Sequence, residues 1–115
     1  MTDSCLFCNI VARDIPADIV YETDAVIAFR DIGPQAPVHI LVIPKRHIPS
    51  LAQAAVEDSE LMGHLLLAVR EVAEREGLAE AGFRTVLNTG ADGGQTVHHL
   101  HAHVLGGRGL RWPPG

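Results

Sequence analysis

The chain has 115 residues, of which 47% are hydrophobic and 20% charged, so we expect a single domain, residues 1–115, folded around one core. The net charge of −5, without a stripe of Lys or Arg, argues against a nucleic-acid partner but allows a small phosphorylated substrate. No apolar run approaches the roughly 20 residues of a membrane span and no signal-peptide pattern is present, so we expect no membrane partner and a cytoplasmic location.

The predicted elements begin with a short helix over residues 5–13, which the Asp14-Ile15-Pro16 sequence ends. Five segments rich in β-branched and other apolar residues then predict strands. In chain order these strands cover residues 19–22, 25–30, 38–43, 83–88 and 97–105. Thr23-Asp24 predicts a tight hairpin turn between the first two of them.

One long helix is expected between residues 58 and 76. Apolar residues recur there at spacings of three and four, at Leu61, Leu65, Val69 and Val72. Asp58 or Ser59 is the expected N-cap, and Gly77 is expected to end the helix. Antiparallel strands with one inserted long helix predict an α+β domain.

Four of the seven histidines lie in the stretch from Val97 to Gly107. Because alternate residues of a strand point to the same face, His99, His101 and His103 should project together while the apolar residues between them are buried. Glycine-rich loops at 90–94 and 106–107 flank this strand and would let backbone N–H groups approach an anion.

Two chemical interpretations of this strand follow from the residues alone. Three imidazoles could hold a catalytic zinc ion, or the central imidazole could act as a nucleophile oriented by its neighbours. A catalytic zinc site usually includes a carboxylate that orients its ligands, and Asp92 is the only acidic residue nearby in the sequence.

The sequence His99-Leu100-His101-Ala102-His103-Val104-Leu105 resembles the alternating signature of the histidine triad superfamily of nucleotide hydrolases and transferases. The likeness continues through residues 31–32, 34–37, 39–47, 88–90, 92–97, 106–108 and 112–115. The final Trp-Pro-Pro-Gly is similar to the branch of histidine triad nucleotide-binding proteins that act as purine nucleoside phosphoramidases. This resemblance implies the histidine triad fold, with a sheet of about five antiparallel strands, and a homodimer that joins two sheets.

The resemblance also implies roles for the histidines. His101 would attack the α-phosphorus of a nucleotide and form a nucleotidyl-histidine intermediate, which water then hydrolyses. The backbone carbonyl of His99 would orient the His101 ring, and His103 would face the phosphate oxygens. His39 matches a family histidine beside the active site, although a buried, hydrogen-bonded structural histidine is an alternative.

Further positions match nucleotide-binding residues of the family. Asn88, Gln95 and Thr96 would bind the phosphate or the leaving group, and Asp31 would bind the ribose hydroxyls. Phe7, Ile10, Phe29 and Ile32 match the apolar walls around the base, although such residues also serve as ordinary core. Trp112 lies in the tail that reaches toward the partner's active site in relatives. His98 departs from the family pattern, and its position predicts packing or surface exposure.

Cys5 and Cys8 form the only cysteine pair. A thioredoxin-like redox pair would need a preceding strand, for which the N-terminus leaves no room, and two free thiols are an alternative. Some bacterial relatives bind a structural zinc through cysteines and histidines at matching positions. The resemblance therefore implies a Zn²⁺ site formed by Cys5, Cys8, His47 and His99, which is a tetrahedral set of ligands.

The leading hypothesis is a hydrolase that cleaves the P–N bond of purine nucleoside phosphoramidates, with no metal in the chemistry. The alternatives are a dinucleoside polyphosphate hydrolase, a metal-dependent hydrolase, and a nucleotide- or zinc-binding regulatory module whose activity is incidental. Histidine rather than glutamine at position 103 favours hydrolysis over nucleotidyl transfer, by analogy with the transferase branch.

Overall fold

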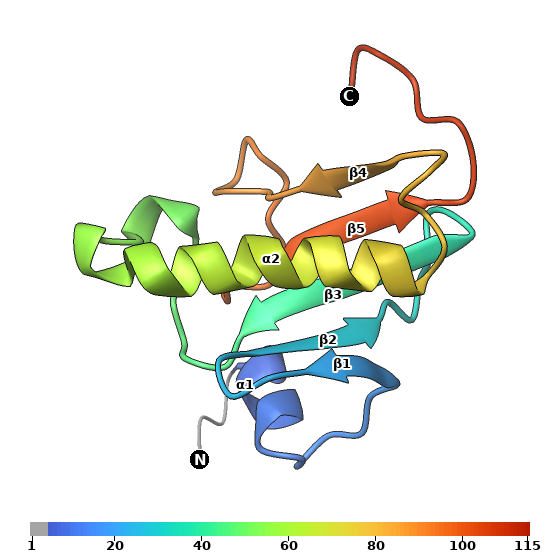
Figure 1. Ribbon diagram of the computed structural model, residues 1–115. Helices are drawn as coiled ribbons and strands as arrows, with labels where there is room; N and C mark the ends of the chain where they lie inside the picture. The colour runs from blue at the N-terminus through green and yellow to red at the C-terminus, as the bar shows by residue number, and fades with distance from the viewer. Residues whose placement is uncertain (1–4) are drawn as a thin grey trace.

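A five-stranded antiparallel sheet forms the centre of the computed structural model, which describes residues 5–115 (Figure 1). The strand order is β1-β2-β3-β5-β4, and every neighbouring pair is antiparallel. The strands are β1 (Ile19–Glu22), β2 (Val26–Arg30), β3 (Val38–Pro44), β4 (Phe83–Val86) and β5 (Ala102–Gly106). The helices are α1 (Leu6–Val11) and α2 (Ser59–Arg75), with short 3-10 turns at Leu51–Gln53 and Val56–Asp58. The α+β class predicted from the sequence is confirmed.

The two helices cover opposite faces of the sheet (Figure 1). Alternate residues of β2 and β3 divide between two apolar clusters because successive strand residues point to opposite sides. Val26 and Ile40 pack with α2, whereas Ile27 and Leu41 pack with Phe7 of α1. Strand β3 is consequently buried on both faces. The rings of His99 and His101 lie on the α1 face, against Phe7.

Helix α2 begins and ends where the sequence predicted, within one residue. Asp58 occupies the N-cap position, where its carboxylate accepts the N–H of Ala55 at 2.8 Å and pairs with Arg46. At the other end Gly77 adopts a positive φ of 75°, a conformation that few residues other than glycine adopt. Within residues 5–115, no helix has the length and apolar character required to cross a membrane.

The last strand is shorter than predicted. It begins at Ala102, so His99 and His101 precede it, whereas the sequence pattern predicted a strand from Val97. Val38 pairs with Gly106 and Val42 with Ala102, so Pro44 would lie opposite Leu100 in the same register. Proline has no N–H to continue the ladder, and the Leu100 N–H donates instead to Ile48 O at 2.7 Å. The segment from 97 to 101 is thereby free to bend and to redirect its side chains.

Candidate active site and metal centre

The triad histidines keep the predicted alternation although only His103 lies within β5. Leu100, Ala102 and Val104 pack into the α2 core, whereas the rings of His99 and His101 contact Phe7 of α1 on the other face. His99 is fully buried, His101 is 5% exposed and His103 is partly buried. The three rings do not share one pocket, however, because the bend before β5 turns His99 toward the cysteines.

The ring of His101 is held by a single backbone atom. Its Nδ1 lies 2.6 Å from the carbonyl oxygen of His99. A carbonyl can only accept, so Nδ1 carries the proton, and in the neutral ring Nε2 carries the lone pair. The ring of Phe7 packs edge-on against it, with centroids 5.1 Å apart. A neutral imidazole in this tautomer can act as a nucleophile through Nε2.

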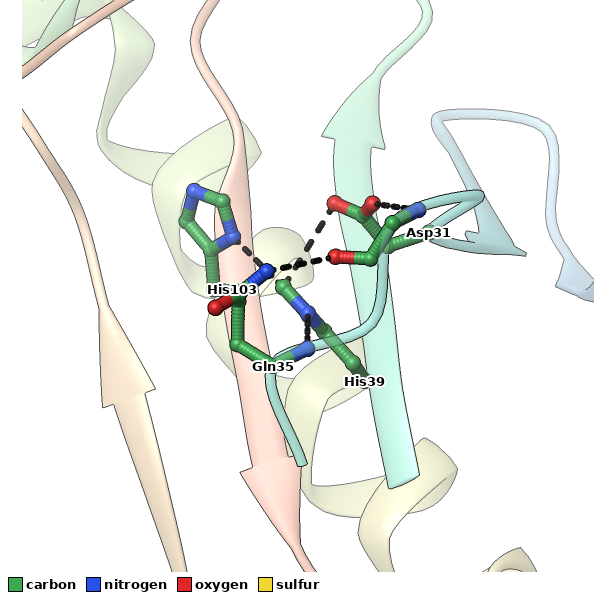
Figure 2. A network of polar contacts seen from close by, with 5 residues as sticks. Asp31, Gln35, His39 and His103 are labelled. Carbon is green, nitrogen blue, oxygen red and sulfur yellow. Dashed lines mark hydrogen bonds and ion pairs between the residues drawn. The ribbon is translucent and has the colours of Figure 1, made fainter. Parts of the chain in front are cut away.

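A second group of polar residues surrounds His103 (Figure 2). Nε2 of His39 lies 2.9 Å from Nδ1 of His103 and 3.5 Å from a carboxylate oxygen of Asp31. The Gln35 N–H donates to Nδ1 of His39 at 3.0 Å. Burial and the neighbouring imidazoles of His101 and His39 lower the pKa of His103 to about 4, so the ring is neutral at neutral pH.

Beside these histidines an apolar cavity of about 520 Å³ opens between α1 and the edge of the sheet. The five residues predicted to bind the base and ribose all line it, namely Phe7, Ile10, Phe29, Asp31 and Ile32. Leu41 also lines it, and Leu41 is the β3 residue that pairs with His103. Ile32 is fully exposed at the rim. The cavity therefore adjoins the histidines through Phe7 and Leu41.

The loop before the triad is braced by Gln95. Its amide oxygen accepts the Gly90 N–H at 3.0 Å, and its amide nitrogen donates to the carbonyls of Pro49 and Val97 at 2.8 and 2.9 Å. These three hydrogen bonds occupy the side-chain amide of Gln95. The predicted contact of Gln95 with phosphate would therefore have to replace one of them. Asn88 is partly buried at the start of the same loop.

Thr96 and Trp112 lie outside the apolar cavity. Thr96 is exposed and lines a separate hollow of about 450 Å³ together with Cys5, His47 and His98. His98 is exposed, as its position predicted. Trp112 is 82% exposed in the tail that follows β5, where Arg84 donates to the carbonyl of Arg111 at 2.7 Å. In a single chain this tail does not line the cavity.

Two cysteines and two histidines converge at the N-terminal end of α1. The Nδ1 atoms of His47 and His99 are 3.2 Å apart, and each lies 3.3–3.5 Å from the sulfurs of Cys5 and Cys8. In tetrahedral zinc sites with ordinary bond lengths, neighbouring ligand atoms are about 3.3–3.8 Å apart. Nε2 of His99 donates to the Pro44 carbonyl at 2.8 Å, which leaves Nδ1 as the free ligand atom. The four residues fit a metal ion of this kind.

Sequence reasoning missed three contributors to the site. Leu41 was detectable, because it lies two residues after His39 on the same face of β3. The N–H of Gln35 and the carbonyl of Pro44 gave no sequence signal, because every residue has a carbonyl group and every residue except proline an N–H.

Comparison with known proteins places this geometry in a family. The HIT domain model matches residues 12–110. An uncharacterized HIT-like protein of Synechococcus elongatus is 61% identical over the full length of both chains. The structure of a HIT family hydrolase from Legionella pneumophila has a TM-score of 0.96 and 49% identity, with 97% of this chain and 100% of that chain covered. A histidine triad protein from Clostridium difficile has a TM-score of 0.92 and 42% identity, with 96% of each chain covered.

The matched segment contains the histidine strand, the loop from Asp31 to His39 and the long helix. The alternating histidines, the sheet order and the similarity over nearly the entire chain agree with one another. The chain therefore belongs to the HIT domain family.

Proposed function

We propose that this protein hydrolyses the P–N bond of purine nucleoside phosphoramidates through a nucleotidyl-His101 intermediate. The observation that carries the proposal is the hydrogen bond from Nδ1 of His101 to the carbonyl of His99 at 2.6 Å, which leaves the lone pair on Nε2. The description of the Legionella relative as a HIT family hydrolase supports the hydrolytic class.

The reaction has two steps. The Nε2 lone pair of His101 forms a bond to the α-phosphorus, the P–N bond breaks, and the leaving nitrogen takes up a proton from solvent and departs as an amine. Water then attacks the same phosphorus, the P–Nε2 bond breaks, and its electron pair returns to the ring as the water releases a proton. The products are a nucleoside monophosphate and the amine. Covalent catalysis of this kind replaces one difficult step by two easier ones.

The surroundings of His101 supply the other groups that the reaction needs. His103 is neutral and donates a hydrogen bond to the phosphoryl oxygens as their charge grows, an effect that reaches about 3 kcal/mol for a well-aimed donor. The apolar cavity receives the base, and Asp31 at its rim accepts the ribose hydroxyls. Asn88, Gln95 and Thr96 bind the phosphate or the leaving group, with Gln95 exchanging one of its loop contacts.

A structural Zn²⁺ held by Cys5, Cys8, His47 and His99 forms part of the proposal. When bound, the ion would cross-link α1 to the segments around residues 47 and 99, and it takes no part in the chemistry. His99 then serves two purposes, since its ring holds the metal while its carbonyl holds His101. Cys5 and Cys8 do not form a disulfide, which suits the reducing cytoplasm that we assign to the protein.

The proposed assembly is a homodimer that joins two sheets, with Trp112 reaching the partner's cavity. The high exposure of Trp112 in the single chain supports this arrangement, because it leaves the ring accessible to a partner subunit. Deleting residues 111–115 should then change the ratio of rates on different substrates while leaving the melting temperature within about 2 °C. A large loss of stability with an unchanged substrate ratio would contradict this role for the tail.

The central test is a quenched single turnover with adenosine 5′-monophosphoramidate, followed by mass spectrometry of the intact protein. We expect one added nucleotidyl group on the wild type and none on His101→Gly. His98→Gly is the matched control, because this neighbouring histidine is exposed and outside the proposed machinery. Full turnover by His101→Gly would disprove the mechanism.

A substrate panel separates the remaining functions. Faster hydrolysis of dinucleoside polyphosphates than of phosphoramidates would favour the dinucleotide hydrolase. Turnover far below about 1 per second, combined with micromolar nucleotide binding, would favour a regulatory module. Loss of chemistry on chelation while the protein stays folded would favour a metal-dependent hydrolase.

A further inference from the structure

The group formed by Asp31, His39 and His103 has a composition that would also suit a metal ion, since two imidazoles and a carboxylate converge there (Figure 2). We infer instead that His39, oriented by the peptide N–H of Gln35, is a positioning residue that holds His103 in the tautomer with its proton on Nε2. The catalytic role of that proton, a hydrogen bond to a phosphoryl oxygen, rests on the proposed function. The assignment of the tautomer does not depend on that function.

The first step is the contact between Gln35 and His39. A backbone N–H can only donate, so Nδ1 of His39, 3.0 Å away, accepts and carries no proton. The proton of the His39 ring is therefore on Nε2. Burial lowers the pKa of His39, which also favours the neutral ring.

The donor is held firmly because the loop that carries it is braced. The side chain of Gln35 donates to the carbonyl of Gly33 at 3.0 Å, and the Gly33 N–H donates to Asp31 at 2.8 Å. Arg108, beyond the end of β5, donates to the carbonyl of Gln35 at 2.9 Å. The side chain and the carbonyl of Gln35 are therefore both held, which limits rotation of this residue and keeps the direction of its N–H.

The second step transfers this constraint to His103. Nε2 of His39 carries a proton and lies 2.9 Å from Nδ1 of His103, so Nδ1 of His103 must be the acceptor, because two N–H groups cannot face each other at that distance. Asp31, 3.5 Å from the same Nε2, stabilises the N–H dipole. His103 therefore carries its proton on Nε2.

Two histidines two residues apart are consequently fixed in opposite tautomers. His101 carries its proton on Nδ1 and has a lone pair on Nε2, whereas His103 has a proton on Nε2. Their ring centroids are 5.0 Å apart. One ring is prepared to attack phosphorus and its neighbour to donate to a phosphoryl oxygen, and a backbone group determines each assignment.

The same reasoning argues against a metal ion at this group. A metal-binding imidazole normally donates its second N–H to an acceptor, as His99 does to Pro44. The second nitrogen of His39 instead faces a donor. A metal on Nε2 of His39 would move the ring proton to Nδ1, directly against the Gln35 N–H. The group formed by the two cysteines, His47 and His99 therefore suits a metal ion. The group formed by Asp31, His39 and His103 instead fixes the positions of ring protons.

The test is ¹⁵N NMR of the full-length, metal-loaded protein without substrate. Long-range ¹H–¹⁵N correlations report which ring nitrogen carries the proton. We expect Nδ1–H for His101, Nε2–H for His39 and His103, and a scalar coupling across the hydrogen bond between Nε2 of His39 and Nδ1 of His103. A proton on Nδ1 of His103, or a stoichiometric metal that quenches or shifts the His39 and His103 signals, would overturn the inference.

Two variants of His39 add a kinetic readout. His39→Gln keeps an amide N–H close to the position of Nε2, whereas His39→Leu removes the donor and keeps the bulk. His39→Leu should lower kcat roughly tenfold with little change in KM, the size of one lost hydrogen bond, and His39→Gln should recover most of that loss. Equal activity of the two variants would contradict the positioning role.

The NMR result also separates this inference from the proposed function. The expected tautomers in a protein that fails to turn over phosphoramidates would support the inference and contradict the function. Turnover through nucleotidyl-His101 with a proton on Nδ1 of His103 would support the function and contradict the inference.

Discussion

His99 holds His101 from its own backbone, with the carbonyl oxygen of His99 2.6 Å from Nδ1 of His101. The imidazole of the same His99 is turned away, toward the sulfurs of Cys5 and Cys8. A change at the cysteines can therefore reach His101 through one residue. The bend that precedes β5 makes this possible, because a regular strand would point both rings in the same direction.

Replacing a cysteine should reveal this coupling. Cys8→Ser should abolish stoichiometric zinc binding and lower the free energy of unfolding by more than about 2 kcal/mol, because the proposed metal ion would tie α1 to the sheet. Metal content by mass spectrometry and thermal unfolding check both effects. His98→Ala, beside the cluster but not part of it, should change neither. Wild-type stability in a zinc-free Cys8→Ser protein would contradict a structural role.

Acid should destabilise the fold through His103. Its pKa is about 4 in the folded protein and about 6.5 in an unfolded chain. Between these values the unfolded state binds a proton that the folded state does not, so the free energy of unfolding decreases as the pH falls from about 6.5 to about 4 and levels off below. Because the ring is partly exposed, we expect a contribution of about 1–2 kcal/mol.

Urea unfolding of the wild type and of His103→Gln at a series of pH values measures this contribution. The variant should have a flatter pH dependence, and the difference between the two proteins should appear between pH 6.5 and 4. Groups whose folded pKa is lowered in both proteins, such as Glu22 beside Lys45, cancel in that difference. Identical curves would mean that His103 takes up its proton as readily when folded as when unfolded.

Ile32 should affect substrate binding without affecting stability. Its side chain is fully exposed at the rim of the apolar cavity, so it contributes nothing to the core of the free protein. Ile32→Ala should raise KM for a purine nucleoside phosphoramidate about tenfold, the effect of losing one apolar contact with the base. The melting temperature should stay the same. Steady-state kinetics and a thermal scan make the comparison.

Leu66→Ala is the control for Ile32, because Leu66 is also exposed but lies on α2, on the other face of the sheet. It should leave KM unchanged. A normal KM for Ile32→Ala would show that the base does not occupy this part of the cavity.

Two glycines should respond in opposite ways to the same substitution. A Cβ on Gly93 would lie 2.4 Å from the carbonyl oxygen of Thr89 and 2.8 Å from its nitrogen, and neither backbone atom can move without distorting the loop before the triad. Gly93→Ala should therefore cost about 2 kcal/mol and reduce activity. Gly63, in α2, has open space around it, and Gly63→Ala should stabilise the protein by about 0.5–1 kcal/mol.

Denaturant unfolding and kinetics of these two variants make the comparison. Gly63→Ala should retain normal turnover because it is remote from the site. A stable and active Gly93→Ala protein would show that the loop can adjust its backbone at Thr89.

The sequence predicted most of the secondary structure because each element has a strong local signal. The spacing of Leu65, Val69 and Val72 defines a helix wherever it occurs, and positive-φ Gly77 ends it by its own conformational freedom. It was likewise predictable that Leu100, Ala102 and Val104 point to the opposite face from the histidines, because the alternation of side chains depends only on the geometry of an extended backbone.

The limits of β5 were not predictable in the same way. Pro44 and Leu100 are 56 positions apart in the chain, and only the register of β3 with β5 brings the proline opposite the place where the ladder stops. The convergence of His47 with the cysteines depends on the packing of α1 against the sheet, because side chains distant in sequence meet only when the fold is assembled. The resemblance to the family anticipated that these side chains converge. The spacing of the cysteines and histidines in the sequence could not predict it, because it gives no distance between them in the folded chain.

By itself the sequence determined which residue types could do chemistry and on which face of the chain they lie, since propensity and periodicity are local properties. The tertiary structure alone decided which ring nitrogen of His39 is protonated. The family resemblance anticipated the carbonyl of His99 beside His101, but the N–H of Gln35 gave no sequence signal, because almost every residue has such a group and its position arises from packing.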